Sequence, residues 1–388
     1  MDFHNKNILL ILHQGSLGGA ERQGLSLGKI LAENHGCTIY LLLTFSAKVS
    51  EDFETYAKSC HVKKIFHFGA PYLVVRKEFS YKNLKRLVWS TKYILRMRKG
   101  LKPYKLDFIF PFLNFPSKVA FYLYKVLPSV KFTFWHQLGL DTFKDDVFEK
   151  YAANHIPCII ANAPNGITLF KDAHPLSKRP SYVLPQFLAF EPVFMEHNAL
   201  LKKYELPENA LCIGMVAHYR PEKLHYLLLN AFIELLETHE NIHLIFLGNK
   251  YNSEITERQF QALQLIVTEN KLEKNVHILS HKPVKEVLNL MDMGVLVSEI
   301  EGTPNAVMEY MAYGLPVVAT AHSGCELLLK NSDFLIKNDQ KDLKNALSTF
   351  INSAKLRQTE GDKNLALIKE YTPENYLSKL KTIMSKTF

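Results

Sequence analysis

Short apolar runs alternate along this chain with amphipathic helical stretches, and this alternation limits the possible folds more than any other feature. Residues 8–13 form the first apolar run, a glycine-containing loop follows at 15–19, and residues 20–33 have the helical spacing of about 3.6 residues. Strands that are buried on both faces lose the polar and apolar alternation of half-exposed strands. The pattern therefore predicts an α/β protein with a parallel sheet between two layers of helices. Further strands of this first unit are predicted at 37–45, 107–110, 130–136, 158–162 and 181–184.

The same alternation starts again after a polar stretch of low periodicity at 186–205. The predicted strands there are 211–217, 242–248, 276–279, 294–298 and 316–319, and the predicted helices are 223–237, 253–269, 285–291 and 304–313. A chain of 388 residues is also too long for one ordinary core. We therefore expect two doubly wound domains, at 1–190 and 206–370. Thr372-Pro373-Glu374 is a good helix start, so residues 371–388 are predicted to form a separate terminal helix.

The composition is typical of a globular protein. Apolar residues make up 47% of the chain and charged residues 22%, and no run approaches the length of about 18 apolar residues that a membrane span needs. The first apolar run is too short for a secretory signal and follows Asp2, with no small-residue cleavage site after it. The five cysteines are far apart and never form a Cys-x-x-Cys pair, which indicates neither a disulfide framework nor a zinc site. We therefore expect a cytoplasmic protein.

The net charge of +9 is concentrated in one segment. Residues 76–105 contain eleven Lys and Arg and a single acid, Glu78, so this segment carries +10 and the remainder of the chain −1. The basicity is therefore local, and we expect no nucleic-acid partner. The segment also contains the apolar residues Leu84, Leu87, Val88, Trp89, Tyr93, Ile94, Leu95 and Met97. It is predicted to be a cationic amphipathic helix, which either docks on the anionic inner face of the cell membrane or packs on the sheet and leaves a solvated basic face.

The most informative segment is GVLVSEIEGTPNAVMEYMAYGLPVVATAHSGCELL, residues 294–328. A predicted strand ends at Ser298, a polar loop follows, and Thr303 and Pro304 are expected to cap and begin a helix. A strand that leads into a helix N-terminus leaves backbone N–H groups without partners, and the helix dipole adds positive charge. Gly302 permits close approach of the backbone. These features predict a phosphate-binding loop.

Glu301 in this loop and Glu309 in the following helix are expected to border one crevice at the carboxyl end of the sheet. Their context, EGTPNAVMEYMAYGLPVVAT, resembles the E-x7-E motif of the family-4 retaining glycosyltransferases. The resemblance implies the GT-B fold, in which two Rossmann-like domains face across a cleft and the C-terminal helix crosses back to the N-terminal domain. It also implies that Glu301 lies near the transferred sugar and that Glu309 accepts hydrogen bonds from the donor ribose. The backbone amides around Gly302, Thr303 and Asn305 would face the pyrophosphate or the sugar.

A second cluster lies in IGMVAHYRPEKLHYLLLNAF, residues 213–232, where a predicted strand opens into a loop with Arg220 and Lys223. A nucleoside diphosphate leaves with negative charge, which a guanidinium and an ammonium group can neutralise without a metal ion. The loop is similar to the Arg and Lys pair that holds the donor phosphates in the same family. It departs from the family in that His218 stands where many relatives have the arginine and Leu224 replaces a common glycine.

Two features of the N-terminal half resemble this family as well. The sequence HQGSLGGAERQ, residues 13–23, contains Gly18 and Gly19, and the resemblance implies a loop that closes over the donor phosphates. The dinucleotide fingerprint G-x-G-x-x-G occurs nowhere in the chain, which argues against a nicotinamide dehydrogenase. His136 ends a predicted strand, and the family usually has a histidine here that contacts the donor sugar. The chain departs from the family after Pro185, where relatives commonly continue into Asn-Gly.

These observations predict a glycosyltransferase that moves a sugar from a UDP- or GDP-linked donor to a saccharide or lipid-linked acceptor bound by the N-terminal domain. The resemblance implies retention of configuration, and the basic segment in the N-terminal domain suggests a membrane-associated acceptor used in cell-surface polysaccharide or glycolipid synthesis. Apart from the nucleotide-sugar co-substrate we expect no cofactor, and we expect no metal ion, because the chain has no Asp-x-Asp motif and Arg220 and Lys223 can replace the cation. Two alternatives remain open: a nucleotide-sugar epimerase of the same fold, and an inactive protein that binds another transferase.

Overall fold

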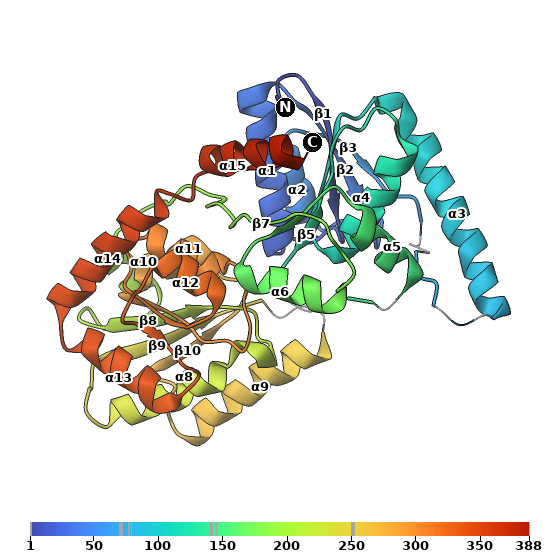
Figure 1. Ribbon diagram of the computed structural model, residues 1–388. Helices are drawn as coiled ribbons and strands as arrows, with labels where there is room; N and C mark the ends of the chain where they lie inside the picture. Colours follow the sequence, from blue (N-terminus) through green and yellow to red (C-terminus); the bar gives the residue numbers. More distant parts are fainter. Residues whose placement is uncertain are drawn as a thin grey trace. The chain divides into compact units, whose positions relative to one another are not determined.

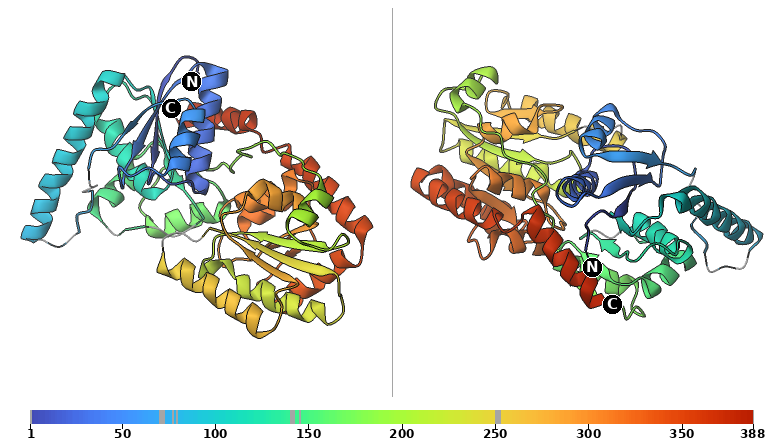
Figure 2. Two further views of the ribbon diagram at one scale, coloured as in Figure 1. Left: turned by 180° about the vertical axis from the view of Figure 1, so that it is seen from behind. Right: turned by 90° about the horizontal axis from the view of Figure 1, so that it is seen from above.

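A computed structural model of the protein describes residues 2–69, 73–76, 78, 80–139, 143–144, 146–249 and 253–387. The chain forms two compact units, which we call unit 1 (Met1–Phe190 with Thr372–Phe388) and unit 2 (Glu191–Tyr371). Both are built on parallel sheets with helices on either side (Figure 1; Figure 2). The predicted α/β class with two doubly wound units is confirmed.

Unit 1 has two parallel sheets, ordered β3-β2-β1-β4 and β5-β6-β7, which a parallel bridge between Phe108 and Phe132 connects. Its strands are β1 (Asn7–Leu12), β2 (Thr38–Leu43), β3 (Val62–Phe66), β4 (Phe108–Pro111), β5 (Trp135–Gln137), β6 (Ile159–Ala161) and β7 (Ser181–Val183). Its helices are α1 (Gly19–His35), α2 (Glu51–Ser59), α3 (Tyr81–Leu101), α4 (Asn114–Val126), α5 (Val147–His155), α6 (Pro164–Ala173) and α15 (Pro373–Thr387). The strand predicted at 130–136 is too long. The structure has a strand only at Trp135–Gln137 (β5), and the described residues just before it pair with β4 at the single Phe132 bridge.

Alternate residues of β1 enter two different cores of unit 1. Ile8, Leu10 and Leu12 pack with α1, α2 and α15, whereas Leu9 and Ile11 pack with α3 and α4. Helix α15 lies beside α1 (Figure 1) and buries Tyr376, Leu377, Leu380, Ile383 and Met384 in the first of these cores. The prediction that the C-terminal helix crosses back to the N-terminal domain is therefore confirmed.

Unit 2 has one six-stranded parallel sheet in the order β10-β9-β8-β11-β12-β13. Its strands are β8 (Leu211–Val216), β9 (Ile242–Leu247), β10 (Val276–Leu279), β11 (Met293–Leu296), β12 (Val317–Thr320) and β13 (Leu335–Ile336). Its helices are α7 (His197–Lys203), α8 (His225–Leu236), α9 (Glu254–Glu269), α10 (Val284–Leu290), α11 (Asn305–Ala312), α12 (Ser323–Leu329), α13 (Gln340–Ile351) and α14 (Ala354–Ile368). Figure 1 shows α8, α9 and α13 on one side of this sheet and α10, α11 and α12 on the other.

Helix α7 occupies part of the polar stretch that sequence reasoning left without structure. The Glu196 side chain caps it by accepting hydrogen bonds from the N–H groups of Asn198 and Ala199. Within the part of the chain that the structure describes, no helix is both long and apolar enough to cross a bilayer. All five cysteines are free and buried.

Candidate functional site

The proposed donor residues follow two neighbouring strands at the centre of the unit 2 sheet. Strand β8 pairs with β11, and from this pair the chain winds outward in opposite directions, through β9 and β10 on one side and β12 and β13 on the other. Such a reversal of strand order separates the two connecting loops and opens a crevice at the carboxyl ends of the strands. The loop after β8 contains Arg220 and Lys223, and the loop after β11 contains Glu301.

The ammonium of Lys223 contacts the carboxylate of Glu301, so the structure brings these two predicted residues together. Both side chains are largely buried, with 21% and 11% of their surfaces exposed. The backbones of the two loops are also joined, because the Glu299 N–H donates to the Glu222 carbonyl at 2.8 Å. A buried ion pair of this kind keeps both charges at the crevice and restricts their rotation.

Arg220 is placed differently from Lys223. It precedes the 3-10 turn Pro221–Lys223, its side chain is 51% exposed, and its guanidinium contacts Glu222 Oε1 at 3.4 Å. The described contacts therefore pair Arg220 with its own loop and not with Glu301, which departs from the expected convergence of both cations. Of the predicted pair, only Lys223 forms a described ion pair with the loop after β11.

Tyr310 bridges the two central strands of this sheet, and sequence reasoning missed it. Its buried hydroxyl accepts from the Val216 N–H at 2.7 Å and donates to the Val295 carbonyl at 3.3 Å, so it joins β8 to β11. Burial raises the pKa of Tyr310, and the negative charges of Glu309 and Glu301 raise it further. Both carboxylates therefore act on the same hydroxyl, although Glu309 lies a helical turn into α11 and is only half-buried.

Helix α11 begins at Asn305 without a side-chain cap. Pro304 is the N-cap residue, so the prediction that Thr303 caps this helix is wrong; Thr303 is buried in the loop instead. An uncapped first turn leaves its backbone N–H groups available to an anion. The start of α12 supports this loop closely, since a Cβ added to Gly324 would lie 1.6 Å from the Gly302 carbonyl oxygen.

A network of three side chains holds the beginning of the same loop. The Ser298 carbonyl accepts hydrogen bonds from His322 Nε2 and Asn338 Nδ2, both at 2.7 Å. Asn338 Oδ1 in turn accepts from the Thr320 hydroxyl at 2.7 Å. These residues follow β12 and β13, so three strand ends converge on one carbonyl. Sequence reasoning did not identify them; a polar run directly after an apolar strand was the available signal.

In unit 1, Gly18 and Gly19 begin helix α1, with Gly18 as its N-cap. The Gly18 N–H donates to the Glu21 carboxylate, as in a capping box. Burial raises the pKa of Glu21 to about 7, and its hydrogen bonds to the backbone only partly oppose this shift. Within the loop that the resemblance expects to close over the donor phosphates, the Gly18 amide therefore has an acid of the protein itself as its partner.

His136 is the middle residue of β5, and its side chain is buried and neutral. Burial lowers the pKa of His136 to about 4, and Nδ1 accepts from the Leu113 N–H at 3.2 Å. Because Nδ1 is an acceptor, the ring proton is on Nε2, which can donate to an oxygen atom. Leu113 has φ of 82°, which is rare for leucine, and this strained backbone directs its N–H to the ring.

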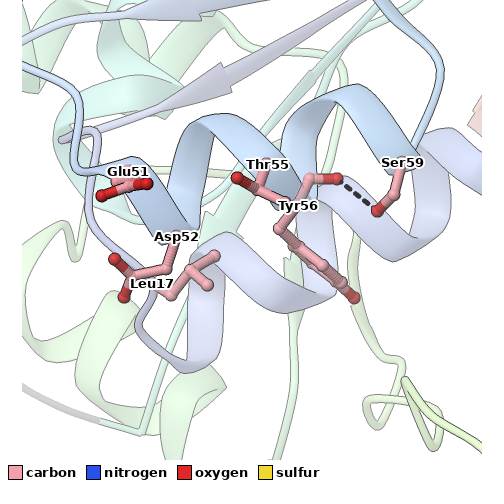
Figure 3. A pocket seen from close by; sticks show the side chains of 6 residues that line it. All are labelled: Leu17, Glu51, Asp52, Thr55, Tyr56 and Ser59. Atoms are coloured by element: carbon pink, nitrogen blue, oxygen red, sulfur yellow. Dashed lines mark hydrogen bonds between the residues drawn. The ribbon is translucent and has the colours of Figure 1, made fainter.

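A hollow of about 450 Å³ opens on unit 1 beside the loop that precedes α1 (Figure 3). It is lined by Leu17 of that loop and by five residues of α2: Glu51, Asp52, Thr55, Tyr56 and Ser59. The Tyr56 hydroxyl pairs with Ser26 Oγ at 2.7 Å, and Ser59 donates to the Tyr56 carbonyl at 2.8 Å. This lining contains none of the predicted site residues. Its carboxylates and hydroxyl groups suit a polyhydroxylated ligand better than an anion.

The two doubly wound units together define the GT-B fold. The crystal structure of Anabaena Alr3699/HepE in complex with UDP and glucose matches over 98% of this chain and 100% of its own, with a TM-score of 0.77 and 17% identity. Sucrose-phosphate synthase from Thermosynechococcus elongatus matches over 98% of this chain and 99% of its own, with a TM-score of 0.73 and 17% identity. At these identities the likeness shows the fold.

The family model described as "Glycosyl transferases group 1" matches residues 197–364, which lie within unit 2. An uncharacterized glycosyltransferase of Methanocaldococcus jannaschii, MJ1059, is 21% identical over 62% of this chain and 63% of its own length. The putative colanic acid biosynthesis glycosyltransferase WcaL of Escherichia coli is 36% identical over 23% of this chain and 25% of its own length. The chain thus spans less than two thirds of each relative, and the match to the group 1 model lies in unit 2.

Proposed function

We propose that the protein is a retaining glycosyltransferase of family 4, which moves a sugar from a UDP- or GDP-linked donor to a saccharide or lipid-linked acceptor. The observation that supports this most strongly is the Lys223–Glu301 ion pair beside the uncapped start of α11, inside the region that matches the group 1 model. The relatives described as glycosyltransferases favour the same class, and WcaL favours a role in cell-surface polysaccharide synthesis.

In this proposal the donor diphosphate binds to the backbone N–H groups of Gly302, Thr303 and Asn305. The Lys223 ammonium turns from Glu301 to the diphosphate and neutralises the charge that develops on the leaving group. Glu301 then faces the transferred sugar, and Glu309 accepts hydrogen bonds from the ribose. Retention means that the acceptor attacks from the face of the leaving group. No metal ion is required in this scheme, because Lys223 and the helix dipole supply positive charge.

Two features of unit 1 receive roles in the same proposal. His136 Nε2–H donates to a hydroxyl of the donor sugar, and the Gly18–Gly19 loop approaches the phosphates once the Glu21 carboxylate leaves the Gly18 amide.

The acceptor saccharide contacts the hollow beside α2, where Asp52 and Glu51 accept from sugar hydroxyls. The Asp52→Asn variant should raise the KM for the acceptor while leaving the KM for the donor unchanged.

The decisive experiment starts with a panel of nucleotide sugars in a thermal-shift assay. A donor at about 100 times its Kd stabilises the fold by about 2.7 kcal/mol, which is readily detected. Products formed from the best donor and candidate acceptors are then identified. A new glycoside supports the proposal, whereas an epimerised nucleotide sugar supports the epimerase and no turnover with any donor supports an inactive partner.

Activity should not depend on added magnesium or manganese. We expect turnover after treatment with a chelator to stay within about twofold of the untreated rate, since Lys223 provides the charge that a cation provides elsewhere. A loss of turnover on chelation that either ion restores contradicts this part of the proposal.

A further inference from the structure

Helix α3 has a buried face and, on its opposite side, an exposed face that is both apolar and basic. The buried residues Tyr93, Met97 and Leu101 recur at helical spacing and pack in a core with β1, β2 and α4. Figure 1 and Figure 2 show α3 along the outside of unit 1. The outward side presents a line of residues at intervals of four and three: Tyr81, Lys85, Val88, Lys92, Leu95 and Lys99. We call this line, with Leu84 and Leu87 next to it, the outer face of α3.

The apolar residues of the outer face are unusually exposed. Of the sixteen large hydrophobic side chains that are exposed in the described part of the chain, six belong to α3: Tyr81, Leu84, Leu87, Val88, Trp89 and Leu95. Leu84 is 56% exposed and Leu95 is 52% exposed. Single exposed apolar side chains are normal on a protein surface, but a group of them on one helix marks an interaction surface. A merely solvated helix face would be polar here.

The charge of α3 has one sign only. Its sequence contains seven Lys and Arg and no Asp or Glu. The guanidinium groups of Arg96 and Arg98 are already hydrogen-bonded within the protein. Arg96 donates to the Phe68 carbonyl and Arg98 to the Val126 carbonyl, both at 3.0 Å. Among the residues that the structure describes, Lys92 and Lys99 have no acidic partner, and the Lys85 ammonium lies over the Trp89 ring at 4.8 Å. Lys77 and Phe79, in the basic segment before this helix, lie outside the described residues.

We propose that the outer face of α3 docks on an anionic lipid bilayer, with the helix lying flat in the headgroup region. Leucine and valine side chains enter the acyl boundary, and the lysines beside them extend to lipid phosphates, as long basic side chains do at membrane surfaces. A nucleic acid or an acidic protein would use the lysines but would leave Leu84, Val88 and Leu95 in water. The alternating apolar and basic line therefore fits a bilayer best. This inference goes beyond the proposed function, since binding needs neither donor nor acceptor.

The test is binding of the full chain to phosphatidylcholine vesicles with and without phosphatidylglycerol. We expect binding only to the vesicles with anionic lipid, decreasing as salt is added. Tryptophan fluorescence provides a site-specific reading, because Trp89 lies on α3 at 38% exposure while Trp135 is fully buried. Emission should shift to shorter wavelength on docking, and the Trp89→Phe variant should lose that shift but keep binding.

Three sets of substitutions separate the contributions of the charged and the apolar side chains to vesicle binding. The neutral set is Lys85→Gln, Lys92→Gln and Lys99→Gln; the polar set is Leu84→Ser, Val88→Ser and Leu95→Ser. The control set, Leu176→Ser, Ile255→Ser and Leu265→Ser, changes apolar side chains elsewhere that are at least as exposed. Both α3 sets should weaken vesicle binding at least tenfold, and the control set should leave it unchanged. Because all nine side chains are exposed, thermal melts should show that every variant folds.

Two outcomes overturn the proposal. Equal binding of the native protein to neutral and anionic vesicles removes the role of charge. If the polar set binds vesicles as tightly as the native protein, the bilayer interior has no role in docking. The outer face of α3 is then a surface for polyanions in general, and the native protein and the polar set should bind heparin equally well. Transfer to a water-soluble acceptor is measured in parallel, so a failure of docking is distinguished from a failure of the glycosyltransferase assignment.

Discussion

The Ser298 carbonyl oxygen sets the position of the Glu301 loop. It accepts from His322 Nε2 and Asn338 Nδ2 at the same distance of 2.7 Å. Both of its lone pairs are therefore used, and the peptide that follows cannot rotate without losing two hydrogen bonds. Three residues later, Glu301 meets Lys223. His322 is thus a positioning residue, which acts on the proposed donor site through the backbone.

Replacing His322 by alanine should weaken donor binding without abolishing turnover. A hydrogen bond of this partly buried kind contributes about 1 kcal/mol, so the KM for the donor should rise about fivefold. His322→Asn retains an N–H donor and should be closer to the native enzyme. Steady-state kinetics with varied donor measure both variants. An increase in KM for the acceptor alone contradicts this role.

Gly324 allows the start of α12 to touch the Gly302 carbonyl. A methyl group there would lie 1.6 Å from that oxygen, so Gly324→Ala must displace backbone. We expect this variant to fold with reduced stability and to lose the donor-induced thermal shift. Ala321→Ser, an exposed change in the same loop, serves as control. Native donor affinity in Gly324→Ala shows that the contact does not shape the site.

The sequence predicted that Lys223 and Glu301 belong to one donor site, because each lies in a loop that directly follows a predicted strand. It did not predict that Arg220 pairs with Glu222, since the choice of partner by a long side chain depends on rotamers and not on spacing. Tyr310 was missed for a different reason. Its role depends on contact with two strands that are distant in sequence, and an apolar stretch of helix hides a tyrosine among core residues.

At the scale of single elements, helix α1 begins with an unusual acid. Glu21 is 5% exposed, and burial raises its pKa from 4.5 to about 7. A carboxyl group whose pKa is higher in the folded state than in the unfolded state binds more protons when folded. Stability is therefore lost as the pH rises from about 4.5 to about 7.

Glu21→Gln should remove this part of the pH dependence. The uncharged amide keeps an oxygen for the Gly18 N–H, so we expect the variant to melt above the native protein at pH 8. The difference in melting temperature should shrink toward pH 5, where Glu21 is protonated. Glu149, whose pKa burial also raises to about 7, is present in both proteins and cancels in the comparison. A difference in melting temperature that stays constant with pH contradicts the assignment of this pH dependence to Glu21.

Long, strongly periodic elements were predictable from the sequence, and short capped ones were not. The strand predicted at 276–279 coincides with β10, and the helix predicted at 253–269 starts one residue before α9. Helix α7 has only seven residues, too few for periodicity to show. The observed start of α11 differs from the prediction, which had Thr303 as the cap. The Thr303 side chain is buried in the loop, so tertiary packing overrides the preference of threonine for the N-cap position.

At the scale of the whole chain, the last helix belongs to the unit that contains the first strand. Leu380 of α15 is fully buried in the same core as Ile8, Leu10 and Leu12. The sequence indicated a separate terminal helix, but its place of packing depends on a core whose β1 residues are more than three hundred positions away. No local pattern contains that information.

Leu380→Ala should destabilise unit 1 selectively, by about 2–5 kcal/mol. Both tryptophans, Trp89 and Trp135, lie in unit 1, so tryptophan fluorescence reports its unfolding specifically. We expect a lower midpoint of denaturation by this probe and nearly native binding of nucleoside diphosphate. Lys379→Ala, an exposed change in the same helix, should have little effect. An unchanged midpoint argues against a structural role of α15.

Calorimetric titration with nucleoside diphosphates, UDP and GDP, tests the central claim that Lys223 and the α11 start bind a diphosphate. Lys223→Ala should weaken binding of the preferred diphosphate by about ten- to a hundredfold, the effect of one charged hydrogen bond. The variant should bind the corresponding nucleoside, which lacks phosphate, as the native protein does. Lys274→Ala, just before β10 and so at the opposite end of the sheet, is the control. Unchanged diphosphate affinity in Lys223→Ala, or no binding of either diphosphate by the native protein, would contradict the claim.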